Sequence, residues 1–403
     1  MKVAQISGAY VGAQEIIEHA IHRECISRGY ESCIFYAVGS SDEENIVCYE
    51  NRASSFCRRA LRKFIGKNPR FSGWSTKRLI RRLQAYQPDL VHLHVLHQGH
   101  LDYEKLFEYL IKKKIPVVYT IHDMWTFTGG CYYYTKENCT GYQTGCLNCP
   151  ADSKRLDNPS DKTAYYFSLK KRLISELSRV QFVAVSPWVA SEMSKGFLAE
   201  YPITVIENGI EPPVLTTTSF DVDDNSDREQ VNLIGVATFW DERKGIDRIF
   251  QMARILGDKY HFHLVGSASD DVLKNAPQNV HFLGYVYDKA ELLRLYAQSD
   301  LHVSASFEET FGMTFIEAAF VGTRSIGYSS TAVKSTLEGV RGIAVEELTA
   351  EAMTSEIQRA MLQGDIKLTS DEIQCVTNRY SSNTMAKKYC DIYQTVLKKD
   401  ANS

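Results

Sequence analysis

One stretch, SASFEETFGMTFIEAAF over residues 304–320, constrains the fold more than any other part of the chain. The alternating run LHVSAS that leads into it predicts a strand. Two adjacent acids and Thr310 follow in what we expect to be a tight loop. The run MTFIEAAF then predicts a helix whose side chains are nearly all apolar. The stretch therefore predicts a strand, a tight loop and a core helix in direct succession.

Two carboxylates in this stretch point to a ligand. Glu309 lies in the loop, and Glu317 lies among apolar helix residues, where burial is costly unless a partner hydrogen-bonds it. Gly312 lets the backbone pass close to a ligand, and the N-terminus of the following helix suits a phosphate. The alternative is an acidic surface loop before a core helix. That alternative does not explain why Glu317 lies among apolar helix residues.

The spacing of Glu309 and Glu317, with Phe311 and Gly312 between them, resembles the E-x7-E signature of retaining GT-B glycosyltransferases of family 4. The resemblance implies an α/β fold of two Rossmann-like domains facing across a cleft. It also implies that Glu309 contacts the transferred sugar and that Glu317 binds the ribose of the nucleotide. The donor-binding residues that it assigns to this stretch are Glu309, Phe311, Gly312, Met313, Thr314 and Glu317.

Length and composition agree with a two-domain globular protein. The chain has 403 residues, more than one ordinary core requires, and no run of about 18 apolar residues. Its net charge of −3 argues against a nucleic-acid partner. The start, MKVAQISGAYVGAQEI, lacks the pattern of a secretory signal. We expect a cytoplasmic protein, peripheral at the inner face of the membrane, whose cysteines are reduced.

Asn208-Gly209 and the double proline that follows predict a domain hinge. We place a first, acceptor-side domain at 1–212 and a second, nucleotide-sugar-binding domain at 213–378. The resemblance further implies that the last segment, 379–403, is a helix that returns to the first domain.

The first domain opens with the strand VAQIS and a loop carrying Gly8 and Gly12. This opening is typical of a doubly wound sheet but is not a G-x-G-x-x-G fingerprint. In the family the equivalent loop faces the cleft, and its glycine-rich form is reduced here to AYVGAQ. His122 ends a later strand, in IHDMWTFTGGC, which resembles a bacterial surface-polysaccharide subgroup in which this histidine lies beside the donor sugar. A structural role for His122 is the alternative.

Four other histidines of this region (His92, His94, His97 and His100) form no recognisable ligand set, so core or cleft positions are expected for them.

In the second domain, Lys244 precedes Gly245 at a strand-to-helix turn, where an ammonium can face a diphosphate in place of a metal. The family carries an Arg six residues before this lysine, but here that position is Thr238, and Arg243 is the substitute. Loops at Gly266 and Gly284 resemble the wall that binds the base, with Tyr285 and Val286 at its edge. Turn formation is the alternative for both glycines.

Residues 52–82 contain eleven Lys or Arg and no acid. Within them, Phe56 to Ile65 has the pattern of a basic amphipathic helix, which suits an anionic membrane surface. A solvated surface helix is the alternative.

Four of the ten cysteines (Cys131, Cys139, Cys146 and Cys149) fall within nineteen residues. The C-x2-C pair at Cys146 and Cys149 suits a tetrahedral structural zinc site. Disulfides and free thiols are the alternatives.

The resemblance implies a retaining hexosyltransferase that moves a sugar from a UDP- or GDP-sugar to a glycan or polyprenyl-diphosphate-linked acceptor. The acceptor belongs to capsule, exopolysaccharide or O-antigen synthesis in this interpretation. The catalytic residues are His122, Glu309 and Lys244, and catalysis requires no cofactor. A catalytically inactive nucleotide-sugar-binding partner of an assembly complex is the second hypothesis. An NAD-dependent oxidoreductase is disfavoured because the dinucleotide fingerprint is incomplete.

Overall fold

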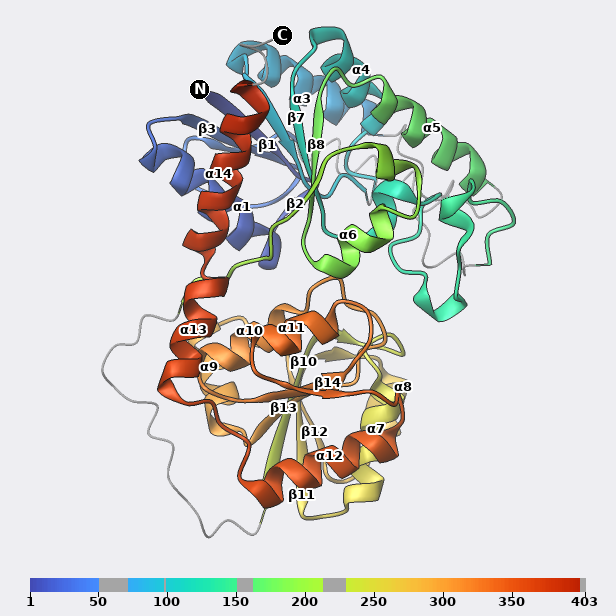
Figure 1. The fold of residues 1–403 in the computed structure, drawn as a ribbon, viewed down its shortest axis with the longest axis vertical. Helices are drawn as coiled ribbons and strands as arrows, with labels where there is room; N and C mark the ends of the chain where they lie inside the picture. The colour runs from blue at the N-terminus through green and yellow to red at the C-terminus, as the bar shows by residue number, and fades with distance from the viewer. Residues whose placement is uncertain (51–71, 98, 151–161, 213–229, 399–403) are drawn as a thin grey trace. The chain divides into compact units, whose positions relative to one another are not determined.

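A computed structural model describes residues 1–50, 72–97, 99–150, 162–212 and 230–398. The chain divides into two compact units (Figure 1). The first comprises Met1–Gly209 with Ser382–Ser403, and the second comprises Ile210–Ser381. The breaks expected from the sequence, after 212 and after 378, each lie three residues from these. The amphipathic segment from Phe56 to Ile65 lies outside the described residues.

The first unit is built on a seven-stranded parallel sheet in the order β5-β3-β1-β6-β7-β8-β9. Its strands are β1 Lys2–Ile6, β3 Glu31–Tyr36, β5 Ile46–Cys48, β6 Leu90–Leu93, β7 Val117–Ile121, β8 Val180–Ala184 and β9 Ile203–Val205, with the small pair β2 Ala9–Tyr10 and β4 Val38–Gly39 beside them. Its helices are α1 Ala13–Ser27, α3 Gly73–Tyr86, α4 Tyr103–Lys113, α5 Thr163–Ser175, α6 Pro187–Met193 and α14 Ser382–Lys398. Short 3-10 helices are η2 Met124–Phe127, η3 Thr135–Glu137, η4 Gly141–Gln143 and η7 Phe197–Glu200.

The second unit is built on a six-stranded parallel sheet in the order β12-β11-β10-β13-β14-β15. Its strands are β10 Val231–Trp240, β11 Tyr260–Ala268, β12 Val280–Gly284, β13 Leu301–Ser304, β14 Ser325–Tyr328 and β15 Ile343–Val345. Its helices are α7 Ile246–Leu256, α8 Asp270–Lys274, α9 Lys289–Gln298, α10 Met313–Phe320, α11 Val333–Gly339, α12 Ala350–Gln363 and α13 Ser370–Tyr380. Helices α7 and α12 pack on one face of the sheet, and α9 and α10 pack on the other. Both units are thus parallel sheets covered by helices, and the α/β prediction is confirmed.

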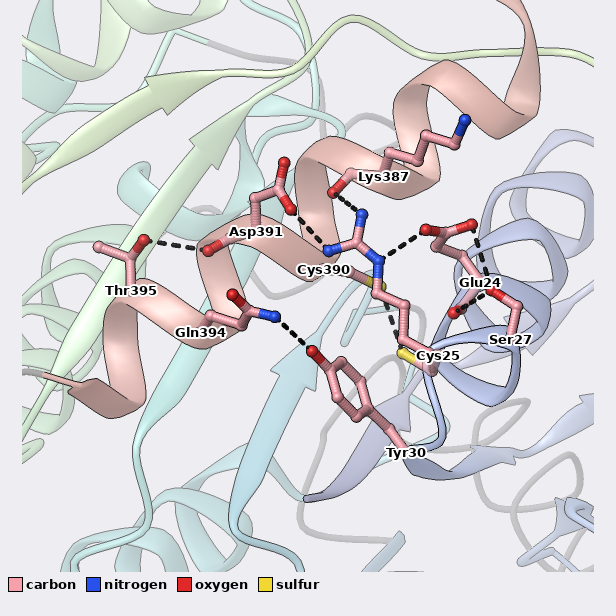
Figure 2. A network of polar contacts seen from close by, with 10 residues as sticks. Glu24, Cys25, Ser27, Tyr30, Lys387, Cys390, Asp391, Gln394 and Thr395 are labelled. Atoms are coloured by element: carbon pink, nitrogen blue, oxygen red, sulfur yellow. Dashed lines mark hydrogen bonds and ion pairs between the residues drawn. The ribbon is translucent and has the colours of Figure 1, made fainter.

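The last helix, α14, belongs to the first unit, where it lies beside α1 (Figure 1). The apolar residues of the two helices share one core cluster with the sheet. Arg28 at the end of α1 adds a polar link, because its guanidinium donates to Asp391 at 2.6 Å and to the carbonyl of Lys387 at 3.2 Å (Figure 2). Tyr30 accepts a hydrogen bond from Gln394 at 2.5 Å in the same network.

Two buried tyrosines of α14 also hold polar groups of the sheet. The hydroxyl of Tyr393 lies 2.6 Å from Nδ1 of His92, and the hydroxyl of Thr120 donates to Tyr389 at 3.1 Å. His92 in turn lies 2.7 Å from Thr120 through its Nε2. Because a buried polar group without a partner is costly, these contacts make α14 part of the core of the unit.

Gly245 permits a close approach between the turn after β10 and the loop after β13 in the second unit. It begins α7 with a φ of 73°, and a Cβ added there would lie 2.1 Å from the carbonyl oxygen of Ala305. The turn after β10 therefore rests directly on the chain that leaves β13.

We expect Gly245→Ala to destabilise the second unit by about 2–4 kcal/mol, because left-handed strain of about 1 kcal/mol adds to a backbone clash. Gly364→Ala is the matched control, since Gly364 has a similar left-handed backbone, with a φ of 68° and a ψ of 17°, and no heavy atom within 4 Å of the added Cβ. Urea unfolding of both variants measures the difference. Equal losses of stability would show that the contact with Ala305 is unimportant.

Candidate functional site

The loop between β13 and α10 is held rigidly by the residues that follow β14. The backbone N–H of Glu309 donates to the hydroxyl of Thr331 at 3.1 Å, and its carbonyl accepts from the N–H of Ala332 at 3.2 Å. Thr336 on α11 donates to the carbonyl of Phe311 at 2.6 Å. These bonds fix the loop on both sides of Glu309, so its carboxylate starts from a defined backbone position.

Glu309 forms an ion pair with Lys244 across the two adjacent loops. Nζ of Lys244 lies 2.5 Å from Oε1 of Glu309, and both side chains are more than four-fifths buried. Burial alone would raise the pKa of Glu309, but Lys244 and Arg243 outweigh that effect and hold the pKa below its usual value. Arg243 also donates to the carbonyl of Glu308 at 3.4 Å. The structure thus brings together three predicted residues: Glu309 pairs with Lys244, and Arg243 lies near enough for its charge to lower the pKa of Glu309.

Glu317 has a different set of partners. It lies on α10 with its carboxylate against Lys289 and within 3.2 Å of the Tyr296 hydroxyl, both on α9. These contacts explain how a carboxylate survives in an apolar helix. Sequence reasoning missed Lys289 and Tyr296, since nothing in the sequence of α9 distinguishes them from ordinary surface and core residues.

The other predicted donor-binding residues of the second unit lie in three places. Gly312 begins α10 with a φ of 94°, and Met313 and Thr314 are partly exposed in its first turn. Phe311 is in the core, 2% exposed, and its ring faces that of Tyr380. The Phe311 side chain therefore anchors the loop to the core and does not face a ligand.

The predicted base wall lies at the ends of β11 and β12. Gly266 has a φ of 123°, and a Cβ there would lie 1.8 Å from the carbonyl oxygen of Ala237, so glycine is required. Tyr285 is 47% exposed and packs against the ring of Tyr287, while Val286 packs on the apolar cluster of α9 and α10. Thr238, at the position where the family carries Arg, is exposed on β10.

His122 in the first unit lies directly after β7, at the carboxyl edge of the sheet. Its Nε2 lies 3.2 Å from Nδ1 of His94, and burial lowers the pKa of His122 to about 4. Beside it, His97 and Asp123 form a second pair at 2.6 Å. Burial opposes ionisation of Asp123, but His97 outweighs it and holds the pKa of the carboxyl below its usual value.

The glycines of the first loop play smaller parts. Gly8 follows β1, where a Cβ would lie 3.1 Å from the carbonyl oxygen of Val95. Gly12 begins α1 with a φ of 61° and is exposed. His122, Gly12 and the four predicted zinc-binding cysteines belong to the first unit, whereas Lys244, Glu309 and the remaining predicted donor-binding residues belong to the second.

The four clustered cysteines line one pocket of about 20 Å³ in the loop after η2. The backbone N–H groups of Gly129 and Gly141 donate to the sulfurs of Cys146 and Cys139 at 3.0 and 3.4 Å. Burial raises the pKa of Cys131 to about 12 and that of Cys146 to about 11. All four are free thiols, and in the described part of the chain no three His, Cys, Asp or Glu are already grouped to hold a metal.

This cysteine loop is anchored on its other side by a buried carboxylate. Oε2 of Glu192 on α6 accepts from the hydroxyls of Tyr134 and Tyr142, each at 2.6 Å. Glu192 also pairs with Lys195. The two tyrosines, whose rings stack, thereby tie the loop to α6.

Both halves of the chain match models of sugar-transferring domains. Residues 15–213 match the model described as Glycosyltransferase Family 4, and residues 230–363 match that described as Glycosyl transferases group 1.

The relatives found by sequence are bacterial. The chain is 23% identical to the putative colanic acid biosynthesis glycosyl transferase WcaC of Escherichia coli, over 93% of this chain and 95% of that one. It is also 27% identical, over 43% of this chain and 47% of the other, to a Campylobacter jejuni enzyme. That enzyme is named N,N'-diacetylbacillosaminyl-diphospho-undecaprenol alpha-1,3-N-acetylgalactosaminyltransferase.

Solved structures agree on the fold. Anabaena HepE, crystallised with UDP and glucose, has a TM-score of 0.64 at 16% identity, and the match covers 98% of this chain and 100% of HepE. With the two parallel-sheet units, this likeness confirms the GT-B prediction.

Proposed function

We propose that this chain, which is a glycosyltransferase with the GT-B fold, transfers a sugar from a nucleotide diphosphate sugar with retention of configuration. The acceptor is a glycan or a polyprenyl-diphosphate-linked sugar. The observation that carries the proposal is the buried Lys244–Glu309 ion pair, because it places a cation and a carboxylate beside the start of α10. No other pair in the described chain joins two of the predicted catalytic residues.

In this proposal the charges are arranged before the donor arrives. The diphosphate oxygens of a UDP- or GDP-sugar accept hydrogen bonds from Lys244 and from the free N–H groups that begin α10. Hydroxyls of the transferred sugar donate to Glu309, whose lowered pKa keeps it ionised. Glu317 accepts hydrogen bonds from the ribose. Because fixed charges stabilise the leaving diphosphate, catalysis requires no divalent cation.

The proposed chemistry is a same-face displacement. The acceptor oxygen forms a bond to the anomeric carbon as the bond from that carbon to the diphosphate oxygen breaks. The proton of the acceptor hydroxyl passes to the leaving phosphate, so the nucleotide diphosphate leaves protonated. No carboxylate of the chain is required as a nucleophile.

The acceptor class is supported by the relatives. One is named for colanic acid biosynthesis and another for transfer to a diphospho-undecaprenol-linked sugar. We infer that this chain acts in bacterial surface-polysaccharide synthesis, of capsule, exopolysaccharide or O-antigen. The second candidate, an inactive nucleotide-sugar-binding partner, is favoured by Thr238 in place of the family's Arg and by the reduced glycine loop. Release of nucleotide diphosphate from a panel of UDP- and GDP-sugars separates the two.

With the donor that this panel identifies, Glu309→Gln should lower kcat about 100-fold, since its contact tightens as the sugar is transferred. Glu317→Ala should instead weaken donor binding about tenfold, because it removes ribose hydrogen bonds far from the reacting bond. Glu356→Ala, at a partly exposed glutamate paired with Arg359 on α12, is the control. Wild-type transfer by both Glu309→Gln and Glu317→Ala would contradict the assignment.

An anionic membrane surface is the proposed second partner. Helix α3 is the described part of the basic region 52–82. Leu79 and Leu83 are buried, while Trp74, Lys77 and Arg81 are exposed at helical spacing, with Trp74 78% exposed. A tryptophan beside cations on one stripe suits the headgroup region of a bilayer. Among the described residues, no helix has both the length and the apolar character to cross a membrane.

Lys77→Ser/Arg78→Ser/Arg81→Ser should reduce binding to phosphatidylglycerol vesicles, at about 1 kcal/mol per residue engaged. Adding salt should weaken the wild-type interaction. Lys112→Ser/Lys113→Ser/Lys114→Ser, which removes the same charge at the end of α4, is the control in a sedimentation assay. If both triple variants sediment like the wild type, α3 does not bind the membrane.

We propose that the cysteine loop binds a structural zinc ion. The four thiols line a pocket of about 20 Å³, which is large enough for one ion. The sulfurs of Cys146 and Cys139 already accept backbone hydrogen bonds. The bond from Gly129 opposes the larger effect of burial on the pKa of Cys146, and a zinc ion would supply the positive charge that converts the thiols to the thiolate ligands it requires. Because the thiols are not yet grouped as a ligand set, binding would have to draw them together.

Elemental analysis of protein purified without chelators should give about one zinc per chain. Cys146→Ser/Cys149→Ser should lose the metal and make the loop sensitive to protease, whereas Cys375→Ser, at an exposed cysteine of α13, should keep it. Metal far below one per chain, with four titratable thiols or two disulfides, would rule out the site.

A further inference from the structure

Three side chains from neighbouring strands form a hydrogen-bonded row in the first unit. Gln5 lies on β1, and His94 and His122 directly follow β6 and β7, which are the next two strands of the sheet. Oε1 of Gln5 lies 3.2 Å from Nε2 of His94, and Nδ1 of His94 lies 3.2 Å from Nε2 of His122. Gln5 and His94 are at most 1% exposed, so water does not compete for these bonds.

The direction of every bond in the row is set at one end. Nε2 of Gln5 donates to the backbone carbonyl of Glu18 at 3.0 Å, and a carbonyl oxygen can only accept. The amide oxygen of Gln5 is therefore the atom that faces His94. Since this oxygen also can only accept, the proton of His94 must be on Nε2.

The second histidine follows from the first. Burial lowers the pKa of His94 well below its usual value and that of His122 to about 4, so both rings are neutral near pH 7. A neutral His94 with its proton on Nε2 has a bare Nδ1, which accepts from His122. The proton of His122 is thus on Nε2, and its Nδ1 carries a lone pair.

We propose that Gln5 and His94 are positioning residues that lock His122 in the Nε2–H tautomer, so that its Nδ1 accepts a hydrogen bond from a hydroxyl of the transferred sugar. This inference rests on the proposed sugar transfer and on the place beside the donor sugar that the family resemblance implies for His122. It narrows the donor class, because a bare nitrogen selects sugars that carry a free hydroxyl at the contacted carbon. It also assigns His122 the role of an acceptor and not of a proton donor.

The tautomer can be measured without any substrate. Two-bond ¹H–¹⁵N spectra of ¹⁵N-histidine-labelled protein at pH 7.5 distinguish a protonated from a bare ring nitrogen, and His122→Asn assigns the signals. We expect a protonated Nε2 and a bare Nδ1 in the wild type. Gln5→Leu should give a mixture of both tautomers at His122. A wild-type His122 protonated on Nδ1, or spectra unchanged in Gln5→Leu, would show that Gln5 and His94 do not fix the tautomer of His122.

A matched control and a kinetic measurement separate the relay from a general loss of packing. Ser32→Ala removes the hydroxyl 2.9 Å from another buried histidine of the same unit, His22, and should leave the His122 signals unchanged. Gln5→Leu should lower kcat/KM for the nucleotide sugar about tenfold, the effect of one hydrogen bond, and change the Kd for UDP or GDP less than about twofold. Equal weakening of both would overturn the positioning role. Wild-type turnover by His122→Asn would instead show that His122 has no part in the reaction. The spectra would still decide whether Gln5 and His94 fix the tautomer of His122.

Discussion

The cost of burying a polar group governs this molecule more than any other constraint. Glu309, Glu317 and His94 all lie where water is largely excluded, and each would be unfavourable alone. Each has a fixed partner: Lys244 for Glu309, Lys289 for Glu317, and Gln5 for His94. Breaking such a pair by removing one member leaves an uncompensated group, so the pairs also fix the geometry of the site.

The parallel sheets explain where these groups gather. The carboxyl ends of parallel strands meet at one edge of a sheet, and the connections that leave it carry ligand-binding residues. In the second unit the turn after β10 and the loop after β13 leave neighbouring strands, and Gly245 lets their backbones touch. Lys244 and Glu309, 65 residues apart, become a direct ion pair for that reason. The same rule aligns Gln5, His94 and His122 in the first unit.

Helix α14 shows that buried polar groups of a sheet can find their partners in a distant part of the chain. The chain leaves the first unit after Gly209 and returns to it at Ser382, and the returning helix supplies the hydroxyls of Tyr389 and Tyr393 to Thr120 and His92. Without α14, Nδ1 of His92 would lose its contact with Tyr393, and the Thr120 hydroxyl would keep only its contact with His92. The cysteine loop is held similarly by two tyrosine hydroxyls on Glu192.

By itself, the sequence determined the local structure around the site and the class of fold. Residues 301–320 form the expected strand, loop and helix, because apolar alternation and the glycine at position 312 act over a few residues. It also singled out Glu309, Lys244 and His122. Only the tertiary structure decided which groups pair. Lys289 and Gln5 carry no local signal, since a partner contributed by another helix or strand is chosen by packing and by the energetic need to satisfy a buried charge or ring nitrogen.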